Sequence, residues 1–177
     1  DKKTILVIGG SLGARTINES IAGSVEKLKE AGIQVVWQTG KLFYEQALEI
    51  QKGNPEVIKA FDFINRMDLA YAVADVVVSR AGALSVSELC LIGKASILVP
   101  SPNVAEDHQT KNAMSLVNKN AALLVKDVDA RNTLVEGAIA LLKDEGKKKT
   151  LSENIKKLAK PDAAKVIADH VISLIKR

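Results

Sequence analysis

The sequence predicts a doubly wound α/β fold, in which helices cover both faces of a parallel sheet. Short apolar runs alternate along the chain with segments whose apolar residues recur at helical spacing, and glycine-containing turns follow several of the runs. The run Val76-Val77-Val78 is typical of a strand that is buried on both faces. Because a helix separates successive strands, the connections should be right-handed crossovers within one Rossmann-like sheet.

Six strands are expected in order along the chain, and most of them lead into a helix. The apolar runs place the strands at residues 4–8, 34–39, 57–61, 76–79, 96–99 and 122–125. Helical spacing predicts one helix through Ile17, Ile21, Val25 and Leu28, a helical face of Phe43, Ala47 and Ile50, a short helix at 68–74, a helix through Val86, Leu89 and Ile92, and another through Ala113, Leu116 and Val117.

The chain becomes all-helical after residue 127. Apolar residues follow one stripe at 134–142 and a second at 166–174, and Pro161 should interrupt the helix between them, since proline disfavours α geometry in the residue before it. We therefore expect a single domain over residues 1–177, with a strand–helix core at about 4–126 and helices at about 127–177. Two lysines that run directly into the first strand resemble a cut between domains, so the chain is expected to be part of a longer protein.

The composition argues against several classes of function. Basic residues number 25 and acidic residues 21, without one basic stripe, and aromatic residues make up only 3%. The stacking platform of a single-strand nucleic-acid binder is missing, so no nucleic-acid partner is expected. The lone Cys90 suits a buried thiol in a reducing, cytoplasmic compartment, and no run reaches the roughly 18 apolar residues of a bilayer span. His108 and His170 are too few for a metal cage, so neither a metal nor a cofactor is expected.

The turn Gly9-Gly10-Ser11-Leu12-Gly13 joins the first strand to the first helix. Glycines let a ligand approach the backbone, and a helix N-terminus favours an anion such as a phosphate, to which Ser11 could donate a hydrogen bond. The alternatives are a plain tight turn and the G-x-S-x-G elbow of α/β-hydrolases, with Ser11 as nucleophile. The elbow is disfavoured because only one strand precedes Ser11. A dinucleotide fingerprint is disfavoured because the glycine spacing differs and no acidic residue ends the second strand.

A second turn, Ser79-Arg80-Ala81-Gly82, follows the fourth predicted strand and repeats this arrangement. In a parallel sheet both turns lie at the carboxyl ends of their strands, so two helix N-termini converge on one crevice, as nucleotide sites of this fold class require. Glu88, further along the following helix, could bind a ligand there. It could equally form a capping box with Ser85 on its own helix, and the spacing alone does not decide.

A third polar segment, residues 100–113, follows the fifth predicted strand and feeds a helix. It brings Asp107, His108 and Gln109 to the same edge of the sheet. Asp107 could simply cap the helix, with His108 and Gln109 in its solvated first turn.

Taken together, five segments resemble the MurG family of peptidoglycan N-acetylglucosaminyltransferases in order and spacing: GGSLGAR, WQTGK, FINRM, ADVVVSRAGALSVSEL, and the stretch from VPSP to DHQTKNA. The resemblance covers about residues 4–126. It implies the C-terminal half of a GT-B glycosyltransferase, in which two Rossmann-like domains face each other across a cleft. The donor would be UDP-N-acetylglucosamine (UDP-GlcNAc), and the acceptor lipid-linked MurNAc-pentapeptide (lipid I), converted with inversion into lipid II.

The resemblance also implies a division of labour. Binding of lipid I, the catalytic base and peripheral association with the inner face of the cytoplasmic membrane would belong to an N-terminal domain that this chain lacks, so no catalytic residue is expected here. The alternatives are another UDP-sugar-dependent GT-B enzyme and a nucleotide-sugar-binding module without transfer activity.

Site residues follow from the resemblance by position. Ser11 would contact the pyrophosphate, Ile64 the uracil through its backbone, Glu88 the ribose hydroxyls and Gln109 the GlcNAc hydroxyls. The full set for UDP-GlcNAc is Ser11, Ile64, Ala83, Leu84, Ser85, Val86, Ser87, Glu88 and Gln109, with Gly10, Gly13, Gly82, Met67 and His108 as accessory positions. His108 departs from the family, which often has a second amide beside Gln109.

Overall fold

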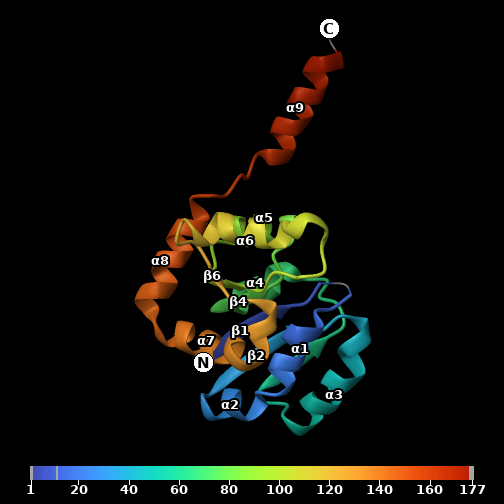
Figure 1. Ribbon diagram of the computed structural model, residues 1–177, viewed down its shortest axis with the longest axis vertical. Helices are drawn as coiled ribbons and strands as arrows, with labels where there is room; N and C mark the ends of the chain where they lie inside the picture. Colours follow the sequence, from blue (N-terminus) through green and yellow to red (C-terminus); the bar gives the residue numbers. More distant parts are fainter. Residues whose placement is uncertain (1, 11, 176–177) are drawn as a thin grey trace.

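The computed structural model describes residues 2–10 and 12–175. Six strands form one parallel sheet with the order β3-β2-β1-β4-β5-β6 (Figure 1). The predicted fold class is confirmed, and each strand begins and ends within one residue of its predicted bounds or closer. The strands are β1 (Lys3–Ile8), β2 (Ile33–Gln38), β3 (Ile58–Phe61), β4 (Val76–Ser79), β5 (Ser96–Leu98) and β6 (Leu123–Leu124).

Helices cover both faces of the sheet. They are α1 (Arg15–Ala22), α2 (Val25–Glu30), α3 (Tyr44–Gly53), α4 (Met67–Val73), α5 (Ala83–Ile92), α6 (His108–Val117), α7 (Ala130–Lys143), α8 (Glu145–Lys156) and α9 (Ala163–Ile175). Short 3-10 turns η1 (Lys41–Phe43), η2 (Ala105–Asp107) and η3 (Asp127–Asp129) precede α3, α6 and α7.

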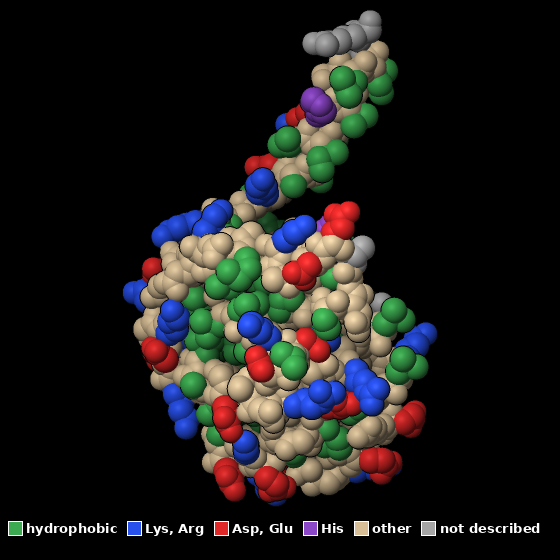
Figure 2. All heavy atoms as spheres, in the orientation of Figure 1, with side chains coloured by type: hydrophobic (Ala, Val, Ile, Leu, Met, Phe, Trp, Pro, Cys, Tyr) green, Lys and Arg blue, Asp and Glu red, His purple; other side chains and the backbone are tan. Residues whose placement is uncertain are grey.

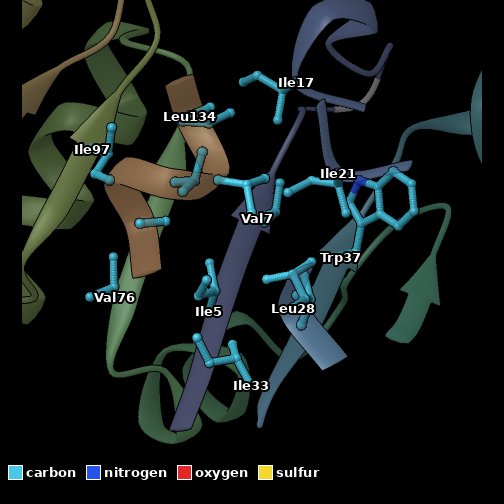
Figure 3. Close-up of a cluster of buried hydrophobic side chains, with 14 of the residues drawn as sticks. Ile5, Val7, Ile17, Ile21, Leu28, Ile33, Trp37, Val76, Ile97 and Leu134 are labelled. Carbon is cyan, nitrogen blue, oxygen red and sulfur yellow. The ribbon is translucent and has the colours of Figure 1, made fainter. Parts of the chain in front are cut away.

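Alternate residues of β1 divide the core into two layers. Ile5 and Val7 belong to a cluster with α1, α2, α3 and α7, and Figure 3 shows Trp37 and Leu134 beside them. Leu6 and Ile8 point to the opposite face and pack with α4, α5 and α6. Apolar burial on both faces explains why the strands read as continuous apolar runs.

The first predicted helix is in fact two helices, and the prediction of one helix was wrong. The chain leaves the helix at Gly23 and Ser24, and α2 starts at Val25. Glycine is a poor helix former, and Ser24 has a non-helical backbone with φ −126°. Ile17 and Leu28 nevertheless both lie in the core, so the apolar spacing continues across the break.

The C-terminal helices behave in two ways. Helix α7 packs on α1, and Leu151 and Ile155 of α8 are fully buried. Residues 157–162 interrupt the helices as Pro161 predicts, and α9 then projects away from the sheet (Figure 1). Every residue of α9 is exposed, and Figure 2 shows apolar side chains along it. Within the described residues, none of the helices combines the length and apolar character that crossing a bilayer requires.

Candidate functional site

The strand register brings three turns together at the carboxyl edge of the sheet. Ile8, the last residue of β1, pairs with Ser79, the last residue of β4. Ser79 pairs in turn with Leu98, the last residue of β5. The three following turns therefore start side by side. The gap between β1 and β4 is also the point where the strand order reverses, which is where domains of this class bind their ligands.

Helices α1, α5 and α6 start at this edge, and none of them has a side-chain cap or an acidic residue in its first turn. In α1 and α5 the cap positions are Ala14 and Gly82. Helix α8, remote from this edge, is capped by the Asp144 carboxylate, which accepts from the N–H of Lys147. The first N–H groups of an uncapped helix favour an anion, so α1 and α5 together suit a phosphate-bearing ligand.

The glycines of the first turn serve different purposes. Gly10 has φ +79°, and a Cβ added there would meet no atom within 4 Å, so its backbone faces open space. Gly13 also has φ +79°, but its added Cβ would lie 2.3 Å from the carbonyl oxygen of Thr39. Gly10 is thus suited to contact a ligand, whereas Gly13 is required for packing against the turn after β2. Ser11 lies outside the described residues.

Side chains of helix α6 bind the backbone of the second turn, Ser79-Arg80-Ala81-Gly82. The Gln109 side-chain oxygen accepts from the N–H of Ala81 at 3.2 Å and from the N–H of Ser101 at 2.9 Å. Asn112 donates from Nδ2 to the carbonyl of Ala81 at 3.0 Å. Gln109 is therefore a link between the turns after β4 and β5, not the solvated first-turn residue of the alternative interpretation.

The first turn of α5 has N–H groups that could bind a ligand at this edge. The N–H of Val86 already donates to the carbonyl of Gly82, and the Ser87 hydroxyl donates to the carbonyl of Ala83. Val86 and Ser87 line a hollow of about 500 Å³ on the outer side of α5. Within the predicted segment 83–88, the N–H groups of residues 83–85 lie in the first turn of α5, at the edge, and Glu88 lies further along the same helix.

Glu88 is not part of a capping box, so that alternative was wrong. The helix begins at Ala83 and Gly82 holds its cap position, which places Ser85 and Glu88 inside the helix. One carboxylate oxygen of Glu88 accepts from the Tyr71 hydroxyl at 3.0 Å. Burial, the Glu88 charge and this hydrogen bond raise the pKa of Tyr71.

The residues predicted to meet a uracil lie in the segment before α4. The Ile64 side chain is buried with the α4–α5–α6 cluster, and Met67 packs on the same cluster at the start of α4. Their side chains therefore anchor this segment to the core, while the neighbouring residues Phe63, Asn65 and Arg66 are exposed.

An ion pair closes the edge between β4 and α7. Arg80 binds Asp127, and the same guanidinium nitrogen donates to the carbonyls of Val99 and Pro100. The second Asp127 oxygen accepts from the Thr16 hydroxyl at 2.9 Å. Both charged side chains are mostly buried, at 16% and 17% exposed. The network joins four segments that are remote in the sequence.

The loop before α6 has an unusual backbone. Glu106 and Asp107 both adopt positive φ values, 51° and 53°, in the left-handed region that non-glycine residues rarely occupy. Asp107 occupies the cap position of α6, but its side chain makes no capping hydrogen bond, so the capping interpretation was wrong. His108 is exposed, as that interpretation expected, and its ring lies 3.9 Å from the Glu106 carboxylate.

Two hollows open along this edge. One of about 540 Å³ lies between the Pro100–Pro102 turn and Val128, with Lys126 and Thr16 on its walls. Another of about 290 Å³ lies between the first turn and the loop after β2. The edge is therefore an open, indented surface.

Sequence reasoning missed three contributors to the site: Tyr71, Asn112 and the Arg80–Asp127 pair. Each acts through a contact between residues at least 17 positions apart, and no local pattern signals such a contact.

A six-stranded parallel sheet with uncapped helix N-termini at its switch point defines a doubly wound α/β domain suited to phosphate-bearing ligands. The chain belongs to the glycosyltransferase family 28 C-terminal domain family, whose model matches residues 4–167.

Two relatives of this chain carry the same name. The "UDP-N-acetylglucosamine--N-acetylmuramyl-(pentapeptide) pyrophosphoryl-undecaprenol N-acetylglucosamine transferase" of Parabacteroides distasonis is 52% identical over 99% of the chain and 48% of its own length. The protein of the same name from Cytophaga hutchinsonii is 57% identical over 97% of the chain and 46% of its own length. The crystal structure of Acinetobacter baumannii MurG is similar with a TM-score of 0.83 and 30% identity, over 99% of this chain and 50% of that one. The chain thus spans about half the length of these relatives.

Proposed function

We propose that this chain is the donor-binding half of a glycosyltransferase that transfers GlcNAc from UDP-GlcNAc to lipid-linked MurNAc-pentapeptide in peptidoglycan synthesis. The observation that carries the proposal is the pairing of Ile8 with Ser79, because the two turns that lead to the uncapped N-termini of α1 and α5 start there side by side. Relatives that are 52% and 57% identical bear the name of this transferase.

In the proposed complex, the pyrophosphate lies between the two helix N-termini. The Gly10 backbone and the N–H groups of Ala83, Leu84 and Ser85 face it, together with Ser11, and Gly82 gives the backbone room. The Ile64 backbone meets the uracil, Glu88 accepts from the ribose hydroxyls, and Gln109 donates to a sugar hydroxyl through its NH2 group. Val86, Ser87, Gly13 and Met67 shape these segments.

The proposed chemistry uses the helix N-termini electrostatically. Breaking the bond between GlcNAc and UDP leaves negative charge on the departing phosphate, and preorganised N–H groups stabilise that charge as it develops. Their positive potential does the work that a bound cation does in many phosphate sites.

The remaining steps are assigned to the other half of the full-length protein. It would supply the base that deprotonates the acceptor hydroxyl, the binding surface for lipid I and peripheral attachment to the inner face of the cytoplasmic membrane. Nucleophilic attack on the sugar carbon opposite the leaving UDP gives inversion.

Calorimetric titration of this chain with UDP, UDP-GlcNAc, ADP and NAD tests the donor site. UDP and UDP-GlcNAc should bind and raise the melting temperature, because a ligand at a hundredfold excess over its Kd stabilises the native state by about 2.7 kcal/mol. ADP and NAD should have no effect. Binding of NAD without binding of UDP would overturn the proposal.

The transfer itself is tested on the full-length protein. Purified enzyme with UDP-GlcNAc and a short-chain lipid I analogue should form the disaccharide product, while this chain alone should not. A full-length protein that binds UDP-GlcNAc and transfers no sugar to this acceptor would contradict the acceptor assignment and leave the donor site standing.

A further inference from the structure

The Tyr71–Glu88 contact links two segments that the proposed function assigns to different parts of one ligand. Tyr71 lies in α4, which follows directly on the segment proposed for the uracil, and Glu88 lies in α5, proposed for the ribose. Their side chains meet at 3.0 Å.

The two partners differ in burial. Tyr71 is 7% exposed, and its ring is packed in the cluster with Ile64 and Leu89, so its hydroxyl has a fixed position. Glu88 is exposed on the surface of α5, and a free glutamate side chain there samples several rotamers. A buried donor that holds one carboxylate oxygen restricts this motion and leaves the other oxygen to accept further hydrogen bonds.

Such restriction has a direct effect on binding. A carboxylate already oriented toward the ligand loses less conformational freedom when it binds, so its hydrogen bonds contribute more to affinity.

We propose that Tyr71 is a positioning residue that holds Glu88 toward the ribose hydroxyls and thereby makes the site select ribonucleotides. The inference rests on the proposed function, because it requires Glu88 to face the ribose. It adds a residue that touches no ligand and acts only through another side chain.

The test compares UDP with 2′,3′-dideoxy-UDP, which lacks both hydroxyls, in calorimetric titrations of the chain and of four variants. Tyr71→Phe removes only the hydroxyl and should raise the Kd for UDP about three- to tenfold, the range for one lost hydrogen bond. The Kd for the dideoxy nucleotide should stay within about twofold of its wild-type value. Tyr44→Phe, the same change at the only other tyrosine, is the matched control and should alter neither Kd.

Glu88→Gln separates the failure of this inference from the failure of the proposed function. If Glu88→Gln weakens both nucleotides equally or neither, Glu88 does not bind ribose and the proposed site itself is wrong. If Glu88→Gln weakens only UDP while Tyr71→Phe weakens both or neither, the site stands and Tyr71 is merely structural. The double variant should bind UDP no more weakly than Glu88→Gln alone, since Tyr71 acts through Glu88. A further additive loss would overturn the inference.

Discussion

Gln109 performs two tasks in the proposed site, and they can be separated by substitution. Its side-chain oxygen accepts two backbone hydrogen bonds, from Ala81 and Ser101, and its NH2 group is proposed to donate to the sugar. Gln109→Ala removes both groups. Gln109→Glu keeps an oxygen for the two backbone donors and removes only the NH2 donor.

The expected stabilities follow from the two backbone contacts. Each net hydrogen bond contributes about 0.5–1.5 kcal/mol, so Gln109→Ala should lower the free energy of unfolding by about 1–3 kcal/mol. Ala81 is fully buried, so water cannot readily replace its lost partner, which favours the upper part of this range. Gln109→Glu should lose about 1 kcal/mol or less, because a carboxylate accepts the same two N–H groups.

Denaturant unfolding and nucleotide titration together measure both tasks. In Gln109→Glu the ratio of the Kd for UDP-GlcNAc to the Kd for UDP should be higher than in the wild type. This ratio cancels the general effect of the added charge, which weakens the binding of both ligands. The substitution should also reduce discrimination between UDP-GlcNAc and UDP-GalNAc. Wild-type stability in Gln109→Ala would refute the loop-linking role, and an unchanged Kd ratio in Gln109→Glu would refute the sugar contact.

Three further predictions concern the framework of the site. Gly13→Ala should lower the free energy of unfolding by about 2 kcal/mol or more beyond the loss caused by Gly10→Ala, measured by thermal or denaturant unfolding. Both residues have positive φ, but only a Cβ at Gly13 collides with a neighbouring backbone. Equal losses in the two variants would refute the packing role of Gly13. Arg80→Met should cost about 3 kcal/mol in the same measurement, since it leaves the mostly buried Asp127 without its cation, and a loss below about 1 kcal/mol would contradict this. For Asp75, burial raises the pKa, but the Thr4 N–H and the Lys3 ammonium outweigh it and the net pKa is lowered. Its stabilisation is therefore present above the unfolded pKa of about 3.9 and is lost as the pH falls through the lower folded pKa, so Asp75→Asn should flatten the stability profile below about pH 4; an unchanged acid slope would count against it.

The strands were predictable because their signal is local. The apolar run at residues 76–79 predicted β4 at its observed bounds. A strand that is buried on both faces requires such a continuous apolar run. The break at Gly23 was not predictable from periodicity, since Val25 and Leu28 continue the apolar spacing of α1. Helix α8 was expected only as part of a helical region, because its apolar residues are few and widely spaced.

The candidate site was predictable only in outline. Strand ends in a parallel sheet share an edge, so the convergence of the turns followed from topology. The local patterns around Glu88 and Asp107 fitted helix caps equally well. Which interpretation holds depends on Tyr71, whose contact with Glu88 spans 17 residues, and on where each helix begins.

The exposure of α9 separates this helix thermodynamically from the rest of the chain. It adds no side chain to either core cluster, and a 13-residue helix whose residues are all exposed is only marginally stable in water. Its amides should exchange with solvent deuterium far faster than those of β1, and its melting should not contribute to the cooperative unfolding transition. Hydrogen exchange along residues 163–175 therefore reports whether another surface packs against α9. The amides of these residues should be protected only when such a surface covers the apolar side of the helix.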